Sequence, residues 1–296
     1  MNLRDLEYLV ALQEVKHFRK AAEKCFVSQP TLSGQISKLE EELGLLLIER
    51  TSRKVIFTHA GEDIAMKARQ ILMEVKGLKE IAKNYQAPLS GPLHMGLIPT
   101  IAPYVLPKIV PQIREKFPAL ELFLYEEQTS ALIKGLEEGE LDCLILAILP
   151  NMERFGRIDL YREPLLLALP KIHEWQSKER IGIHDLKGHQ LLMLEDGHCL
   201  REQAMGYCFE AGAKEDTSFK ATSLETLRHM VAAGCGITLL PELAVPQGQN
   251  DHHDLCYKRF SEPQPGRTIS LLYRMHSVRR PCFNELAKLV QSLIQF

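Results

Sequence analysis

Apolar residues recur at helical spacing from the start of the chain. Between residues 2 and 15 they fall on one face, which predicts a helix with a buried side: Leu3, Leu6, Leu9, Val10 and Leu12. A second, shorter helix is predicted over residues 18–24, where Ala21 and Ala22 allow a neighbouring element to approach closely. The chain therefore opens with two helices.

The third predicted helix has clear start and stop signals. Ser28 is a favourable N-cap, Pro30 suits the first turn, and Gly44 favours termination. The apolar stripe between them consists of Leu32, Ile36, Leu39 and Leu43. Two short helices joined by a tight turn, the second opening on small polar side chains, predict a helix-turn-helix. Residues 46–57 follow as a wing with basic residues at its tip.

A single long helix is predicted from His59 to about Gln86, because this stretch contains no proline and its apolar residues keep helical spacing. A long amphipathic helix between two domains usually finds its partner in another chain, so it indicates dimerisation. The segment from Pro88 to Pro92 marks a domain boundary. We therefore expect a DNA-binding domain over 1–58 and a linker helix over 59–87.

Beyond the boundary, predicted strands alternate with predicted helices. The strands are 93–98, 120–125, 143–148, 165–169, 190–194 and 268–273. The helices are 103–117, 129–139, 222–233 and 283–295. This alternation predicts α/β layers on a mostly parallel sheet, where ligands bind at the carboxyl ends of the strands.

Charge and composition say less about the function than the pattern of apolar and polar residues does. The net charge is −2, and residues 1–58 hold nine Lys/Arg against eight Asp/Glu. DNA binding would therefore depend on well-placed cations and on several copies of the domain. The N-terminus carries charges where a signal peptide has an apolar core, and no run of 18 apolar residues occurs, so we expect a cytosolic protein without a membrane span.

The seven cysteines are odd in number and include no CxxC pair, which argues against a disulfide framework or a zinc site. Cys199 and Cys208 lie nine residues apart, a rise of about 13.5 Å if the segment is helical. A disulfide needs Cα atoms within roughly 4.4–6.8 Å, so joining these thiols would require the segment to refold. The pair is therefore a possible switch. Three other cysteines lie in apolar patterns and are predicted to be core residues: Cys25, Cys143 and Cys235.

Several motifs resemble those of the LysR-type transcriptional regulators. At the N-terminus these are DLEYLVAL, SQPTLSGQISKLEEELG and LLIERTSR, and VAAGCGITLLP is similar to the glycine-rich turn of their effector domain. Further segments resemble the peroxide-sensing OxyR group of that family: GPLHMGLIPT, LDCLILA, LLMLEDGHCLREQAMGYCFEAGA and ATSLETLRHMVAAG. The resemblance spans nearly the whole chain and includes Cys199 and Cys208.

The resemblance implies an α+β multi-domain fold: a winged helix-turn-helix, a linker helix, and an α/β effector domain over 88–296 that resembles a periplasmic binding protein. Its subdomain I would cover about 88–161 plus 268–296, and subdomain II about 162–267. The resemblance also implies homodimers or homotetramers on double-stranded promoter DNA, contact with RNA polymerase, and a cytoplasmic, nucleoid-associated location. We expect no enzymatic activity, no cofactor and no metal.

The resemblance also implies the roles of individual residues. The Cys199 thiolate would react with hydrogen peroxide, and Cys208 would resolve the sulfenic acid as a disulfide. Thr100 and Thr129 match positions that hold the peroxide, and His198 and Arg267 match polar residues around the thiol. In the sequence, His198 and Arg201 are the cations nearest to Cys199. The predicted DNA-contacting residues are Ser28, Gln29, Pro30, Thr31, Ser33, Gln35, Lys38, Arg50, Arg53 and Lys54.

Several alternatives stay open at this point. The chain could be a LysR regulator of a small organic effector with incidental cysteines, or a thiol peroxidase. Cys199 and Cys208 could be buried structural thiols, because free cysteine is among the most buried residue types. Ser28 and Thr31 could serve only as helix caps.

Overall fold

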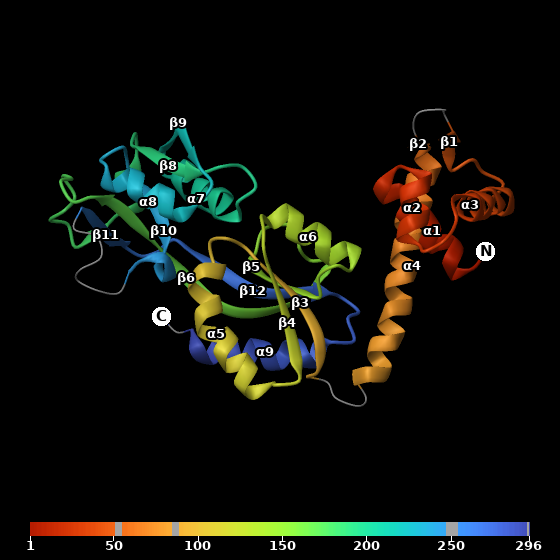
Figure 1. Cartoon of the computed structure of the whole chain (residues 1–296). Coiled ribbons are helices and arrows are strands. Elements are labelled where there is room, and N and C mark those ends of the chain that lie inside the picture. The colour runs from red at the N-terminus through yellow and green to blue at the C-terminus, as the bar shows by residue number, and fades with distance from the viewer. Residues whose placement is uncertain (51–54, 85–88, 247–253, 295) are drawn as a thin grey trace. The chain divides into compact units, whose positions relative to one another are not determined.

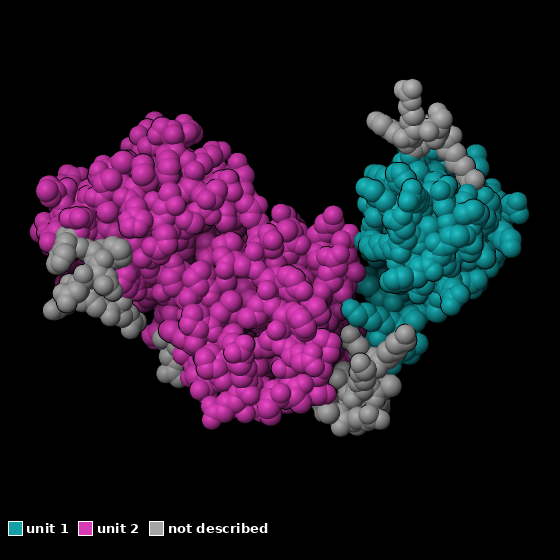
Figure 2. All heavy atoms as spheres, viewed as in Figure 1, with its two compact units in different colours: residues 1–86 teal, residues 87–296 magenta. Residues whose placement is uncertain are grey.

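The computed structural model describes residues 1–50, 55–84, 89–246, 254–294 and 296. The chain divides into two compact units, residues 1–86 and residues 87–296, which Figure 2 shows in different colours. Within the described ranges, no helix is both long and apolar enough to cross a lipid bilayer.

The first unit contains four helices and a two-stranded hairpin within its described residues (Figure 1). They are α1 (Leu3–Val15), α2 (Phe18–Lys24), α3 (Gln29–Leu43), β1 (Ile48–Arg50), β2 (Val55–Phe57) and α4 (His59–Asn84). The strands β1 and β2 pair in antiparallel fashion. The predicted helix-turn-helix, wing and long helix are therefore confirmed.

Local contacts fix the wing onto the helices. The Glu40 carboxylate on α3 accepts the backbone N–H groups of Leu47 and Ile48 at 2.9 and 3.1 Å. Gly61 on α4 lies so close to the wing that an added Cβ would come within 2.0 Å of the Leu47 carbonyl oxygen. Because the start of the wing is held by two helices, the position of β1 follows from α3 and α4.

The second unit contains the remaining helices and strands. The helices are α5 (Ala102–Lys116), α6 (Thr129–Glu138), α7 (Cys199–Glu210), α8 (Leu224–Ala232) and α9 (Arg280–Leu293), with 3-10 turns η1 (Ile183–Leu186) and η2 (Glu242–Ala244). The strands are β3 (Gly91–Leu97), β4 (Leu120–Glu126), β5 (Cys143–Ala147), β6 (Phe155–Pro170), β7 (Arg180–Ile181), β8 (Gln190–Leu194), β9 (Lys214–Ala221), β10 (Thr238–Pro241), β11 (Leu255–Phe260) and β12 (Gly266–Arg274).

Among the described residues, the main sheet has the order β4-β3-β5-β12-β6-β11-β7, with β10 also paired to β6, while β8 and β9 form a separate parallel pair. The expectation of a mostly parallel sheet is wrong. Strand β12 is antiparallel to both β5 and β6, and β10 and β11 are antiparallel to β6. The prediction also shortened β6 to residues 165–169, whereas residues 155–164 belong to the same strand and pair with β12, which is distant in sequence.

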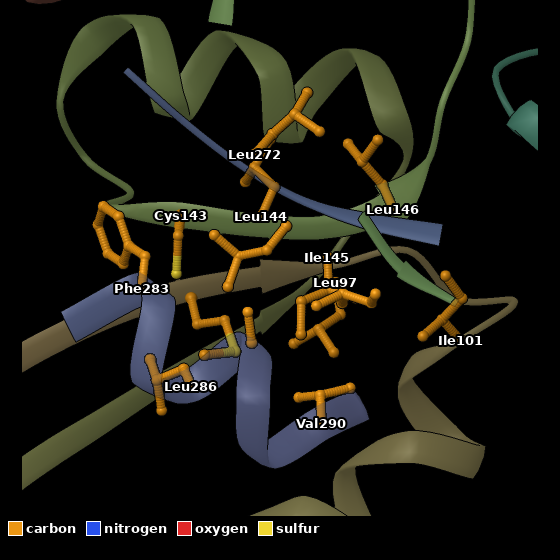
Figure 3. Packing of buried hydrophobic residues seen from close by; sticks show 14 of the residues in the cluster. Leu97, Ile101, Cys143, Leu144, Ile145, Leu146, Leu272, Phe283, Leu286 and Val290 are labelled. Atoms are coloured by element: carbon orange, nitrogen blue, oxygen red, sulfur yellow. The ribbon is translucent and has the colours of Figure 1, made fainter. Parts of the chain in front are cut away.

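The second unit has two separate hydrophobic cores. One, which we call the β5–α9 core, is shown in Figure 3 and includes Leu97, Leu144, Leu272, Phe283 and Val290. The other, which we call the β8–α8 core, includes Leu167, Leu192, Leu227, Leu239 and Phe260. Strand β6 contributes residues to both cores, so it runs from one to the other. Two cores that share strand β6 make the second unit a domain of two parts.

Candidate functional site

Cys199 is the first residue of α7, directly after the loop that follows β8. The first N–H groups of a helix lack intrahelical acceptors, and the helix dipole places partial positive charge there. This position therefore favours a thiolate. The side chain is only 2% exposed and packs in the β5–α9 core, although most of the apolar residues of α7 belong to the β8–α8 core.

Opposing effects act on the ionisation of Cys199. Burial is the largest and raises the pKa of the thiol above its ordinary value. The charge of Arg267 on β12, the Thr129 hydroxyl at the start of α6, and the Ala147 backbone N–H at the end of β5 all lower that pKa. The reduced site therefore holds a protonated thiol beside three groups that would stabilise its anion.

Arg267 is held by Glu163 of β6 and by Thr100, which lies in the loop between β3 and α5. Its Nε donates to Glu163 Oε2 at 2.8 Å, while its terminal nitrogens donate to the Thr100 hydroxyl at 2.8 Å and the Thr100 carbonyl at 3.0 Å. The side chains of Arg267 and Glu163 are fully buried. The second Glu163 oxygen accepts the Leu243 N–H at 3.0 Å, so the carboxylate is well satisfied. These contacts fix the guanidinium in place near the thiol.

The Thr129 hydroxyl is buried and has no well-aligned hydrogen-bond partner among the described residues. It nevertheless lies close enough to Cys199 to lower the pKa of the thiol. A buried hydroxyl without a full partner is unusual, and here it sits beside the candidate reactive atom. The hydroxyl is available to donate to the sulfur or to a molecule bound next to it.

His198 lies in the loop between β8 and α7, directly before Cys199, but it does not stabilise the thiolate as Arg267 and Thr129 do. The imidazole is 4% exposed, and burial lowers its pKa, partly offset by the charge of Glu195. Its Nε2 has no hydrogen-bond partner among the described residues. The ring is therefore neutral at pH 7 and adds no positive charge to the thiol.

Arg201, the other nearby cation in the sequence, points elsewhere. It donates to Glu215 at 2.5 and 2.7 Å and to the Leu194 carbonyl at 3.2 Å, and it pairs with Asp196 at 2.9 Å. Adjacency in sequence was therefore misleading, because the helical turn directs this side chain toward β9. The ion pairs of Arg201 with Asp196 and Glu215 stabilise the first turn of α7.

Cys208 lies near the other end of α7 and belongs to the β8–α8 core. It is 3% exposed, and burial raises the pKa of its thiol to about 12. Both cysteines are free thiols, and the nine residue steps from Cys199 to Cys208 correspond to a helical rise of about 13.5 Å. The two thiols of α7 thus lie in different cores of the same unit.

The remaining cysteines have varied surroundings. Cys143 and Cys282 are buried, and Cys25 and Cys256 are partly buried. Cys235 is exposed, so the prediction that it is a core residue is wrong. It follows Gly234, whose φ of +80° turns the chain after α8 and leaves the next side chain in solvent. Across the described residues, no group of three or more His, Cys, Asp or Glu side chains is arranged to hold a metal ion.

A cleft of about 540 Å³ lies beside α7. Its lining includes Gln203 and Tyr207 of α7 and Arg267 of β12. The Gln203 amide donates to the Ile148 carbonyl at 3.1 Å, and the Tyr207 hydroxyl donates to the Gly266 carbonyl at 2.8 Å. The cleft brings solvent to the side of α7 near the buried guanidinium.

The other predicted site lies on α3 in the first unit. Ser28 caps the helix by accepting the Thr31 N–H at 3.3 Å, and the two hydroxyls lie 2.7 Å apart. The predicted contact residues of α3 form a polar surface that is exposed at Ser28, Gln29, Pro30, Thr31 and Lys38 and half-buried at Ser33 and Gln35. Arg53, Lys54 and the side chain of Arg50 lie outside the described residues. The first turn of α3 is therefore open to a partner.

Comparison with known proteins decides the family. Residues 3–62 match the bacterial regulatory helix-turn-helix protein family of the LysR type, and residues 86–295 match the LysR substrate binding domain. The chain belongs to the LysR family. Within that family, this LysR regulator is 57% identical over 295 residues to a hydrogen peroxide-inducible genes activator of Dickeya chrysanthemi, covering 100% of this chain and 96% of that protein.

Another relative of this LysR regulator is the DNA-binding transcriptional dual regulator OxyR of Escherichia coli K12, which is 56% identical over 292 residues, with 99% and 95% of the two chains covered. A full-length OxyR variant from Pseudomonas aeruginosa matches with a TM-score of 0.78 and 35% identity, covering 99% of each chain. The oxidised form of an OxyR matches with a TM-score of 0.64 and 52% identity, covering 69% of this chain and 96% of that one. The LysR regulator is therefore of the OxyR, or hydrogen peroxide-inducible activator, type.

The resemblance placed Thr100, Thr129 and Arg267 in the site. The fold places Arg267 and Thr129 beside Cys199 and joins Thr100 to Arg267 by hydrogen bonds. Sequence reasoning missed Glu163, the buried partner of Arg267. The two residues are 104 positions apart, and the first part of β6 was not predicted as a strand. A single sequence contains no local signal for such a pair.

Proposed function

We propose that this chain is a DNA-binding transcriptional regulator that senses hydrogen peroxide through a reversible Cys199–Cys208 disulfide and thereby controls oxidative-stress genes. One observation supports this most strongly. Cys199 begins α7 beside Arg267, Thr129 and the Ala147 N–H, while Cys208 of the same helix is buried in the other core. A thiol surrounded by anion-stabilising groups suits reaction with peroxide, and a second thiol on the same helix suits resolution.

The first chemical step is attack of the Cys199 thiolate on one peroxide oxygen. An S–O bond forms, the O–O bond breaks, and the departing hydroxide takes up a proton to give water. The product is a sulfenic acid at Cys199. Thr129 and Thr100 orient the peroxide in this proposal. Because the Thr100 hydroxyl already accepts a hydrogen bond from Arg267, its own proton is free to be donated to a peroxide oxygen.

The second step joins the two cysteines. The deprotonated Cys208 sulfur attacks the sulfenic sulfur, an S–S bond forms, the S–O bond breaks, and hydroxide leaves and is protonated to water. In total, the two thiols lose two electrons and two protons to one molecule of peroxide. Burial raises the pKa of Cys208 to about 12 in the reduced state, so the attack follows movement of this thiol out of its core.

The disulfide requires a change of structure. Helical geometry separates the two Cα atoms by about 13.5 Å, whereas a disulfide spans at most roughly 6.8 Å. α7 must therefore unwind, and at least one cysteine must leave its core. Because α7 contributes to both cores, its refolding changes how the two parts of the effector domain are joined. This is how a local oxidation would alter the DNA-binding state.

DNA binding is assigned to α3 and the wing, supported by the LysR helix-turn-helix match. Within it we propose contacts from Gln29, Thr31, Ser33 and Gln35 to base edges, and from Lys38 and the wing cations to phosphates. We also propose assembly as a homodimer or homotetramer, contact with RNA polymerase, and a nucleoid-associated location in the cytoplasm. The proposed divisions of the chain are 1–58, 59–87 and 88–296.

The proposal is tested by peroxide-dependent transcription in single-cysteine variants. Cys199→Ser should abolish the response and leave DNA binding intact. Cys208→Ser should still form a sulfenic acid at Cys199, which a sulfenic-acid-specific probe detects, but no disulfide. The exposed thiol Cys235 provides a matched control, because Cys235→Ser should respond like the wild type. A full response in Cys199→Ser would exclude this mechanism and favour a small organic effector bound in the cleft beside α7.

A further inference from the structure

Gln128 occupies the N-cap position of α6, immediately before Thr129, but its side chain does not cap that helix. Its Nε2 instead donates to Glu195 Oε1 at 3.1 Å, across 67 residues of sequence. An N-cap side chain normally satisfies the free N–H groups of its own helix. Here it is directed to the loop between β8 and α7.

The same carboxamide also packs on Gly197. A Cβ added to Gly197 would lie 2.6 Å from Gln128 Oε1 and 3.2 Å from its Cδ, so no larger residue fits without movement. Gly197 has a φ of +96°, a backbone conformation that glycine adopts without strain. Gln128 thus makes two contacts with this loop: it donates to the Glu195 carboxylate, and it packs against the backbone of Gly197, which has no side chain.

The contact joins the two cores of the effector domain. Gln128 precedes α6, whose Leu132 and Leu136 pack in the β5–α9 core. Glu195 follows β8, whose leucines pack in the β8–α8 core. The contact also lies next to the redox site, because Gln128 adjoins Thr129 and Gly197 is two residues before Cys199.

We propose that Gln128 is a positioning residue that fastens the segment 195–198 to the start of α6 and so stabilises the reduced conformation, in which Cys199 lies beside Thr129. This inference rests on the proposed Cys199–Cys208 switch. When the disulfide forms, Cys199 and Cys208 must approach and the segment before α7 must shift, which breaks the contact between Gln128 and Glu195. The contact therefore favours the dithiol over the disulfide.

The sign of the effect follows from this argument. Removing a contact that exists only in the reduced state makes the disulfide easier to form, so the midpoint potential of the Cys199–Cys208 couple becomes more negative. Gln128→Ala should shift the equilibrium constant toward the disulfide by about tenfold, which for a two-electron couple corresponds to about 30 mV. Gln128→Glu keeps the shape of the side chain but faces Glu195 with a like charge, so its shift should be at least as large.

The test uses the full-length protein equilibrated in buffers of reduced and oxidised dithiothreitol. The fraction of Cys199–Cys208 disulfide is read by alkylation and peptide mass spectrometry. Gln112→Ala on α5 is the matched control, because Gln112 is a half-buried glutamine on a helix of the same unit and should leave the potential unchanged. A double-mutant cycle with Glu195→Ala should be non-additive, since both changes remove the same hydrogen bond.

Potentials of Gln128→Ala and Gln128→Glu that equal that of the wild type, or that shift in the positive direction, would overturn the positioning role while the wild-type disulfide still forms. Failure of the wild type itself to form a Cys199–Cys208 disulfide would instead remove the proposed switch, and with it this role. A negative shift in both variants, with Gln112→Ala unchanged, would support the proposal.

Discussion

At the Cys199 sulfur, burial and three stabilising groups act in opposite directions on one ionisation. The net result is a raised pKa, so the thiolate proposed to react with peroxide is a minor species at neutral pH. Reactivity at this site therefore depends on how strongly Arg267, the Thr129 hydroxyl and the Ala147 backbone N–H favour the anion.

The pH dependence of the reaction follows from the direction of this shift. Below the raised pKa of Cys199, the thiolate fraction increases with pH, so the second-order rate constant with peroxide should rise about tenfold per pH unit between pH 6 and pH 8. Rapid-mixing kinetics with alkylation of the unreacted thiol measure this rate. A rate that stays constant over this range would show that the thiol is already ionised at pH 6.

Thr129→Val tests the hydroxyl that lies beside the thiol. Valine keeps the shape of the side chain and removes a hydroxyl that has no other well-aligned partner among the described residues. The reaction should slow about tenfold, corresponding to one hydrogen bond to an anion, while the thermal midpoint stays unchanged. Thr100→Val provides the contrast: it should also lower stability, because Arg267 loses an acceptor. An unchanged rate in Thr129→Val would exclude the hydroxyl from the reaction.

Among the elements, α7 is the one whose folding we propose to be coupled to oxidation. Its two cysteines lie in different cores, so the helix must break before they can meet. The stability of the helix itself should then set part of the redox equilibrium. Gly206 lies within α7, and a Cβ added there would meet no atom within 4 Å.

Gly206→Ala should therefore stabilise the reduced state by about 1 kcal/mol through helix propensity alone. The midpoint potential of the Cys199–Cys208 couple should become less negative by about 20 mV. Gly77→Ala on α4 is the matched control, since an added Cβ also meets open space there and α4 does not contain the switch. Equal potentials in Gly206→Ala and Gly77→Ala would show that α7 stays helical in the oxidised protein.

The elements also show what a single sequence can predict. Local signals located α3 well, because Ser28, Pro30 and Gly44 mark its ends and its leucines follow one stripe. The helix-turn-helix, the wing and α6 were predicted in the same way. Strands β9, β10 and β11 and the first part of β6 were missed, because pairing partners distant in sequence form them. Glu163 and Gln128 were missed in the site for the same reason.

At the scale of the whole molecule, a redox change in the second unit must reach a DNA-binding surface in the first. The first unit has little excess positive charge, so affinity for DNA depends on individual cations placed on α3 and the wing. Lys38 is exposed on α3, where it can contact a phosphate.

Lys38→Ala should weaken binding to all DNA sequences to a similar degree. For each bound copy, the slope of log K against log salt should become shallower by about 0.9. Gln29→Ala should instead reduce discrimination between operator sequences and leave the salt slope unchanged, because an amide reads base edges without counterion release. Titrations of operator and unrelated DNA at several salt concentrations distinguish a phosphate contact from a base contact. A change of slope in Gln29→Ala would assign that residue to the backbone.

The central claim is that peroxide joins Cys199 to Cys208, and mass spectrometry tests it most directly. The reduced full-length protein is analysed intact and as peptides, before and after one molar equivalent of hydrogen peroxide. The account predicts a loss of two hydrogens and a peptide in which Cys199 is linked to Cys208. Both thiols still open to alkylation after peroxide, with no linked peptide, would contradict it.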